Sequence, residues 1–121
     1  MHKDRRIEGS LSQGMNLEEI VHLTNKVGME YAVARKEADR LDLLKATYKA
    51  KAMEKYDDGL RSESKIRRLA EIDNEYVHFL EQLAAAKAES ERLRIRYESY
   101  KNLFEARRSM LSFKKAEMNL I

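Results

Sequence analysis

The chain has 121 residues, of which 37% are charged and 43% are hydrophobic, with four glycines and no proline, cysteine or tryptophan. This composition is typical of long helices, and the lack of cysteine excludes disulfides, thiolate catalysis and cysteine-based zinc sites. The net charge of +3 is uneven, because residues 87–115 hold nine basic and four acidic side chains, while the remainder holds 15 basic and 17 acidic ones. We therefore expect one elongated all-α domain with a locally basic segment.

The N-terminal segment, residues 1–15, is expected to be a flexible arm. It contains two glycines and two serines, shows no apolar periodicity, and lacks the apolar core of a signal peptide. No stretch of the chain approaches the roughly 18 consecutive apolar residues of a membrane span. Together with the absence of cysteine, these features predict a cytoplasmic protein with no membrane partner.

A first helix is expected over residues 17–56. Asn16 is a favourable N-cap residue, and Glu19 completes an approximate capping box three residues later. Apolar side chains then recur at alternating steps of three and four, which is the period of an amphipathic helix. The two apolar rows consist of Ile20, Val27, Ala34, Leu41 and Tyr48, and of Thr24, Tyr31, Ala38 and Ala52.

The sequence Asp57-Asp58-Gly59 predicts a turn over residues 57–61, and a second helix is expected over residues 62–120. This helix has the heptad pattern of a coiled coil, in which the a and d positions form the seam. The a row consists of Leu69, Tyr76, Leu83, Ser90, Tyr97, Phe104, Leu111 and Met118. The d row consists of Ile72, Phe79, Ala86, Leu93, Tyr100, Arg107, Lys114 and Ile121.

The predicted fold class is all-α, a long antiparallel helical hairpin of coiled-coil type over residues 16–121. A tight turn places Leu17 opposite about residue 101, so the second helix extends beyond the first by about twenty residues, or about 30 Å. Large apolar side chains in this overhang favour burial against another molecule, and a second copy of the chain is the first candidate, which predicts a homo-oligomer. The candidate interface consists of Phe104, Met110, Leu111, Phe113, Met118, Leu120 and Ile121.

The basic segment forms a candidate nucleic-acid-binding surface. Five of its side chains recur at steps of seven in the e positions, and aromatic side chains lie between them, an array suited to phosphate contact and base stacking. The alternative is a solvated or inter-chain edge, because e positions of coiled coils are commonly charged and the tyrosines fall on the a and d rows. The candidate residues are Lys87, Arg92, Arg94, Arg96, Lys101, Arg107, Arg108, Lys114 and Lys115.

No catalytic residue, cofactor or small-molecule substrate is expected. The chain has no Gly-rich phosphate loop and no nucleophile elbow, and an extended hairpin offers no concave pocket. Two Glu-x-x-His steps, starting at Glu19 and Glu75, have the spacing of a carboxylate-bridged metal site, but in the hairpin they lie about 36 Å apart, so no metal is expected. A basic amphipathic C-terminal helix could also bind a membrane surface, but Glu105 and Glu117 interrupt its basic face.

The C-terminal part of the chain resembles a pattern in small helical proteins of bacteriophages. The residues that carry the resemblance are the run Tyr97–Ser109 and the closing Lys115-Ala116-Glu117-Met118, which follow an Ala/Lys/Glu-rich helix and a short turn with Gly and Ser. Such proteins tend to be encoded among phage genes for recombination and single-strand annealing. The resemblance implies an accessory role in DNA metabolism or in countering host nucleases, within the host cytoplasm.

We therefore expect a non-enzymatic binding protein, an accessory factor in DNA recombination or metabolism that acts through its basic C-terminal helix. Its partner would be single- or double-stranded DNA or a DNA-processing protein. The alternative is a structural or adaptor coiled coil, or an inhibitor that docks on a host protein without contacting nucleic acid. Either function is expected to reside in residues 101–121, because basic and apolar side chains lie side by side there.

Overall fold

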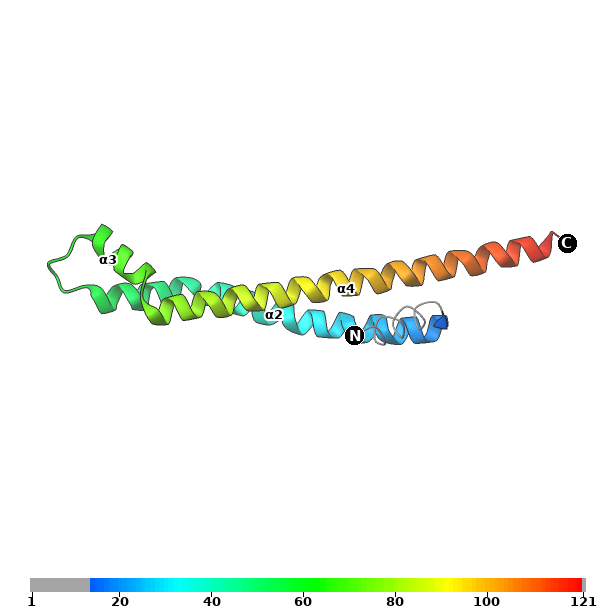
Figure 1. Cartoon of the computed structure of the whole chain (residues 1–121), viewed down its shortest axis with the longest axis horizontal. Coiled ribbons are helices and arrows are strands. Elements are labelled where there is room, and N and C mark those ends of the chain that lie inside the picture. Colours follow the sequence, from blue (N-terminus) through cyan, green and yellow to red (C-terminus); the bar gives the residue numbers. More distant parts are fainter. Residues whose placement is uncertain (1–13, 121) are drawn as a thin grey trace, which may run out of the picture. The chain divides into compact units, whose positions relative to one another are not determined.

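The computed structural model describes residues 14–120, which contain two long helices, α2 (Leu17–Tyr56) and α4 (Asn74–Asn119), and a short one between them, α3 (Glu63–Glu71) (Figure 1). No strand occurs among these residues, which confirms the predicted all-α class. The expected flexible arm lies outside the described residues apart from its last two positions, and so does Ile121.

Helix α2 begins directly after Asn16, whose side chain caps it. The Oδ1 atom of Asn16 accepts a 2.9 Å hydrogen bond from the backbone N–H of Glu19. This bond satisfies one of the four N–H groups that have no acceptor inside the helix. The carboxylates of Glu18 and Glu19 also suit the positive end of the helix dipole. The helix then continues to Tyr56, over the range that the apolar periodicity predicts.

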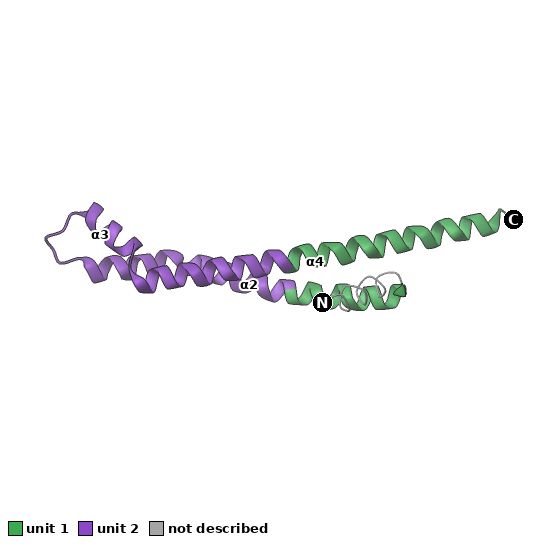
Figure 2. Ribbon diagram, in the orientation of Figure 1, with its two compact units in different colours: residues 1–30, 93–121 green, residues 31–92 purple. Residues whose placement is uncertain are grey.

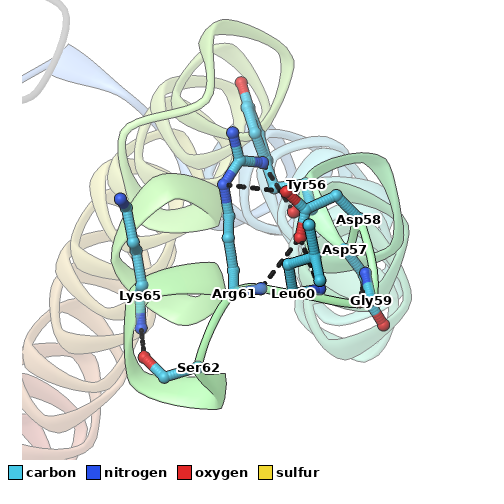
Figure 3. A network of polar contacts seen from close by, with 8 residues as sticks. All are labelled: Tyr56, Asp57, Asp58, Gly59, Leu60, Arg61, Ser62 and Lys65. Atoms are coloured by element: carbon cyan, nitrogen blue, oxygen red, sulfur yellow. Dashed lines mark hydrogen bonds and ion pairs between the residues drawn. The ribbon is translucent and has the colours of Figure 1, made fainter.

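A hydrogen-bonded turn separates α2 from α3 (Figure 3). Gly59 has φ +79°, a left-handed conformation that favours glycine. The Asp58 carboxylate accepts hydrogen bonds from the backbone N–H groups of Leu60 and Arg61 at 2.9 and 2.8 Å, and these bonds lower the pKa of Asp58. The Arg61 guanidinium donates to the backbone carbonyl of Tyr56 at 2.8 Å, so the turn is attached to the end of α2.

The predicted single helix over residues 62–120 is wrong, because the chain leaves the helical conformation between α3 and α4. Ile72 ends α3 with φ −102° and ψ 2°. Asp73 then caps α4: its backbone carbonyl accepts the N–H of Val77 at 2.8 Å, and its carboxylate accepts the N–H of Tyr76 at 3.2 Å. Aspartate is a strong N-cap residue for this reason. No Gly or Pro marks the break, and Asp73 is a helix-start signal inside a heptad pattern that continues across it.

The structure divides into two compact units, one of which comprises residues 31–92 (purple in Figure 2). Phe79 is fully buried in it, and its ring stacks on that of Tyr48 with 4.1 Å between the centroids. All three helices contribute to this core, and burial of apolar surface is its main source of stability. The buried core residues are Ala52, Ala70, Tyr76, Phe79 and Leu83.

Within this unit, α2 and α4 pack in opposite directions. Asp42 forms a 3.0 Å ion pair with Lys87, and Lys55 forms a 2.9 Å ion pair with Asp73. Positions further along α2 therefore meet positions nearer the start of α4, and the last turn of α2 lies beside the first turn of α4.

The other unit combines the start of α2 with the last part of α4 (green in Figure 2), and its described residues are 14–30 and 93–120. Tyr97 lies against Gly28, where an added Cβ atom would stand 2.8 Å from the tyrosine ring. Gly28 is thus the point at which an α4 side chain approaches the backbone of α2. The apolar side chains buried in this unit are Met15, Ile20, Val27 and Leu93.

The register of α2 against α4 differs from the predicted one. A tight turn places Gly28 opposite Ser90, whereas the structure places it against Tyr97, one heptad later. The reason is α3, because a separate helix lengthens the connection between α2 and α4. Seam positions of α4 are therefore buried or half-buried as far as Arg107, and the stretch that extends past the start of α2 is shorter than expected (Figure 2).

Candidate functional site

The nine basic residues of the candidate nucleic-acid-binding surface all lie on α4. Lys87 and Arg92 belong to the unit of residues 31–92, and the other seven belong to the unit that contains the end of α4. Four of the nine form ion pairs with carboxylates, and such surface pairs are weak and exchangeable. The pairs are Lys87–Asp42 at 3.0 Å, Arg92–Glu89 at 2.6 Å, Arg94–Glu98 at 2.9 Å and Arg108–Glu105 at 2.8 Å.

An acidic row explains why the positive charge gathers at the end of α4. Glu91, Glu98 and Glu105 are seven apart and lie beside the basic e row of the heptad. The next two positions of this acidic row are serine and asparagine, whereas the basic row continues to Lys115. Residues 106–116 consequently contain four basic side chains and no acidic one.

The remaining basic side chains differ in their surroundings. The ammonium of Lys101 lies 4.7 Å from the centroid of the Tyr97 ring, a cation–π contact. Arg107 is half-buried and is the last seam position of α4 that is not exposed in residues 14–120. Of the nine candidates, the last three, Arg96, Lys114 and Lys115, are exposed and have no hydrogen bond, ion pair or ring contact within the described residues.

The tyrosines of this segment lie on the seam and do not form an exposed stacking surface. Tyr97 and Tyr100 are half-buried, and Tyr97 contacts Gly28 of α2. Phe113, by contrast, is 68% exposed. These positions favour the interpretation in which the tyrosines pack between helices, and they leave Phe113 as an aromatic side chain available to a partner.

One residue of the predicted apolar interface is covered by α2. Phe104 is half-buried and lines a surface groove with Val21, Thr24 and Asn25 of α2. The prediction that Phe104 lies in an uncovered overhang is therefore wrong. The physical reason is the shift of register by one heptad, which brings α2 alongside this part of α4.

Every residue from 108 to 120 is exposed, and we name this stretch of α4 the C-terminal surface. The exposed fractions of its large apolar residues range from 52% for Leu111 to 87% for Leu120. Several exposed large apolar side chains in one short stretch are typical of an interaction site. Its large apolar side chains are Met110, Leu111, Phe113, Met118 and Leu120, and its basic side chains are Arg108, Lys114 and Lys115.

A buried carboxylate that sequence reasoning missed lies at the start of α4. Asp73 is 3% exposed and accepts hydrogen bonds from the Lys55 ammonium at 2.9 Å and the Tyr56 hydroxyl at 2.7 Å. These bonds, with Lys55 the largest cause, lower the pKa of Asp73 to about 2, and the same contact raises the pKa of Lys55. These bonds join the end of α2 to the start of α4, so we assign Asp73 a structural role.

The two Glu-x-x-His steps lie in different units, the first in residues 14–30 and the second in residues 31–92. Among the described residues, no group of three or more His, Asp or Glu side chains is arranged to hold a metal ion. Across residues 14–120, no helix has an apolar stretch of the length needed to cross a bilayer.

The chemistry available to the C-terminal surface follows from its two kinds of side chain. Its apolar groups gain free energy when a partner removes them from water. Its cations can form charge-assisted hydrogen bonds with carboxylates or phosphates. No protein family, curated protein or solved structure matches the chain.

Proposed function

We propose that this chain is a non-enzymatic helical binding protein that acts through the C-terminal surface, as an accessory factor in DNA recombination or another step of DNA metabolism. The observation that supports binding is the exposure of five large apolar side chains beside three basic ones in residues 108–120. Each large apolar side chain gains about 1.5–3 kcal/mol when a partner buries it. The role in DNA metabolism rests on the resemblance of the C-terminal sequence to bacteriophage proteins.

We also propose that α2 and α4 belong to one antiparallel hairpin of coiled-coil type. The heptad rows in both halves of the sequence support this arrangement. The chain has no cysteine, so introduced cysteines can report the pairing. We expect Asp42→Cys with Lys87→Cys to be joined by a short bismaleimide into a species the size of one chain. A product of two chains at high dilution would contradict the hairpin.

Photo-crosslinking in cells that express the chain tests the binding role. A photoreactive amino acid in place of Phe113 is expected to give a discrete adduct with a partner, because this side chain is exposed on the C-terminal surface. The matched control is Lys26, which is exposed on α2 in the same unit. The same adducts at both positions, or none at Phe113, would contradict the proposal.

Direct contact with DNA is the second candidate mode of action. The observation that favours it is the run of four basic residues without an acidic one in residues 106–116, of which Lys114 and Lys115 have no ion-pair partner within the described residues. Phosphate contacts of this kind release counterions, so binding would weaken steeply as salt is added. The ion pairs of Arg94 and Arg108 with Glu98 and Glu105 act against this mode, since these carboxylates repel phosphates.

Anisotropy titrations of labelled single- and double-stranded oligonucleotides decide whether DNA is contacted. Lys114→Glu with Lys115→Glu is expected to abolish binding at low salt, while Lys36→Glu with Lys45→Glu, on exposed positions of α2, makes the same change of net charge and leaves binding intact. Equal losses in the two variants would indicate a general effect of net charge. No binding of the wild-type chain at low salt would remove this mode.

A further inference from the structure

The C-terminal surface has a charge pattern that restricts the kind of partner it can bind, an inference that rests on the binding role proposed above. Leu111 and Met118 continue the a row of the seam at steps of seven and are exposed. In a heptad, the d and e rows lie on either side of the a row. Both of these rows are basic here: Arg107 and Lys114 occupy the d row, and Arg108 and Lys115 occupy the e row.

We propose that the C-terminal surface binds an acidic amphipathic helix of a partner protein. The apolar side chains of that helix would pack on Leu111 and Met118, and its carboxylates would lie beside the two basic rows. A helix fits because the apolar seam of α4, which packs on α2 as far as Phe104, continues past the start of α2 with the same seven-residue spacing. This spacing accepts the side chains of another helix.

Charge complementarity identifies the partner as acidic. Along the part of α4 that α2 covers, the basic e row has the carboxylates of Glu98 and Glu105 beside it, in ion pairs with Arg94 and Arg108. Beyond Glu105 the chain supplies no further carboxylate on that side, and Lys115 has no ion-pair partner in the described structure. A partner helix with acidic flanks would supply carboxylates to the basic side chains beyond Glu105, as Glu98 and Glu105 do for Arg94 and Arg108.

A second copy of the chain fits the same surface less well. Two copies packed in parallel would place Lys114 against Lys114 near the middle of the seam, since this residue occupies a d position. Two copies packed antiparallel would bring the e rows together, so that Arg108 and Lys115 would face cations. Like charges at an interface suppress pairing, and self-association is therefore the competing outcome of the test.

Nucleic acid would neutralise the basic side chains of this surface but would not bury its apolar row. Phosphates can neutralise Lys114 and Lys115, yet they leave Leu111 and Met118 in contact with water, and only burial of these side chains recovers their hydrophobic free energy. Binding that depends on the basic residues alone would indicate nucleic acid. Binding that depends on both rows would indicate a helical protein partner.

The probes are two labelled helical peptides of about three heptads with leucine at a and d. One carries glutamate at the flanking e and g positions, and the other carries lysine there. Titrated with the full chain, the glutamate peptide is expected to bind at least tenfold more tightly than the lysine peptide. Arg108→Glu with Lys115→Glu should remove this preference, because the acidic e row then offsets the basic d row of Arg107 and Lys114. Leu111→Ser with Met118→Ser should weaken binding of the glutamate peptide at least tenfold, without lowering the melting temperature, because both residues are exposed.

Three results would overturn the inference: no peptide binds, both bind equally, or sedimentation shows that residues 108–120 hold two copies together. The photo-crosslinking experiment separates this failure from failure of the proposed function. A protein adduct at Phe113 without peptide binding would keep the binding role and reject the acidic helix. Absence of both adduct and peptide binding would reject the two proposals together.

Discussion

The ammonium of Lys55 donates a 2.9 Å hydrogen bond to the carboxylate of Asp73, 18 residues further along the chain. The same carboxylate accepts the hydroxyl of Tyr56 at 2.7 Å, and its other oxygen accepts the backbone N–H of Tyr76 at 3.2 Å. One side chain therefore joins the end of α2 to the start of α4 and fixes where α4 begins. The break that separates α3 from α4 depends on this residue.

Replacement of Asp73 is expected to destabilise the unit of residues 31–92. Asp73→Ala removes the N-cap of α4 and leaves Lys55 and Tyr56 without their acceptor, so we expect the melting temperature to fall by roughly 5 °C or more. Asp73→Asn keeps an acceptor for the cap and should cost less. Circular dichroism during heating measures both changes. The control is Asp39→Ala, because Asp39 is exposed and its one ion pair within residues 14–120 is a 3.9 Å contact with Arg35. A loss as large as that of Asp73→Ala would contradict the account.

The low pKa of Asp73 predicts an acid-dependent loss of stability. A carboxylate with a lower pKa in the folded state binds fewer protons there, so it stabilises the fold above its unfolded pKa of about 3.9. That contribution is lost as the pH falls through the folded value of about 2. The difference in the free energy of unfolding between wild type and Asp73→Asn should therefore be constant above about pH 5 and shrink between about pH 4 and pH 2. Urea denaturation at a series of pH values measures it, and a difference that stays constant down to pH 2 would be inconsistent with this role.

The contact between Gly28 and Tyr97 predicts that Gly28→Ala has opposite effects on the free energy of unfolding in the presence and in the absence of the Tyr97 side chain. Alanine is favoured over glycine inside a helix by about 1 kcal/mol, but in the wild type its Cβ atom would stand 2.8 Å from the tyrosine ring. Gly28→Ala should therefore destabilise the wild-type chain by displacing Tyr97, and should stabilise a Tyr97→Ala chain. Chemical denaturation of the four proteins gives the coupling energy. An equal effect of Gly28→Ala in both backgrounds would show that the two residues are not in contact.

Two leucines of α4 provide a matched test of where the covered part of the helix ends. Leu93 is 5% exposed and Leu111 is 52% exposed. Leu93→Ala is expected to lower the free energy of unfolding by about 2–5 kcal/mol, as is usual for a buried leucine. Leu111→Ala should change it little, because alanine is at least as good a helix former. Denaturant titration compares the two, and a large loss in Leu111→Ala would mean that this residue is already buried in the free protein.

The helical class, the bounds of α2 and most seam positions could be predicted from the sequence, because each depends on local periodicity or on a cap. Ile20, Val27 and Ala38 lie on the predicted α2 rows and are buried, as Phe79 and Leu83 are on the predicted α4 rows. These positions follow from the 3.5-residue repeat alone.

The break at Asp73 and the resulting register could not be predicted in this way. Asp73 ends one helix and starts another through bonds from Lys55 and Tyr56, which are distant in the sequence. Ile72 fits the predicted d row, yet it is 72% exposed, because it lies at the break. The candidate site differs from the predicted one for the same reason. Phe104 lies in the part of α4 that α2 covers, and the exposed stretch begins at Arg108.

Amide hydrogen exchange of the dilute full chain, free and with the glutamate-flanked peptide, tests the binding role of the C-terminal surface most directly. In the free chain, amides of residues 108–119 should exchange much faster than those of residues 93–105 in the same helix, because no other described segment packs on them. Saturation with the peptide should slow exchange in residues 108–119 and leave residues 31–56 unchanged. Slow exchange of residues 108–119 in the dilute free chain, or no change when the peptide is added, would contradict the account.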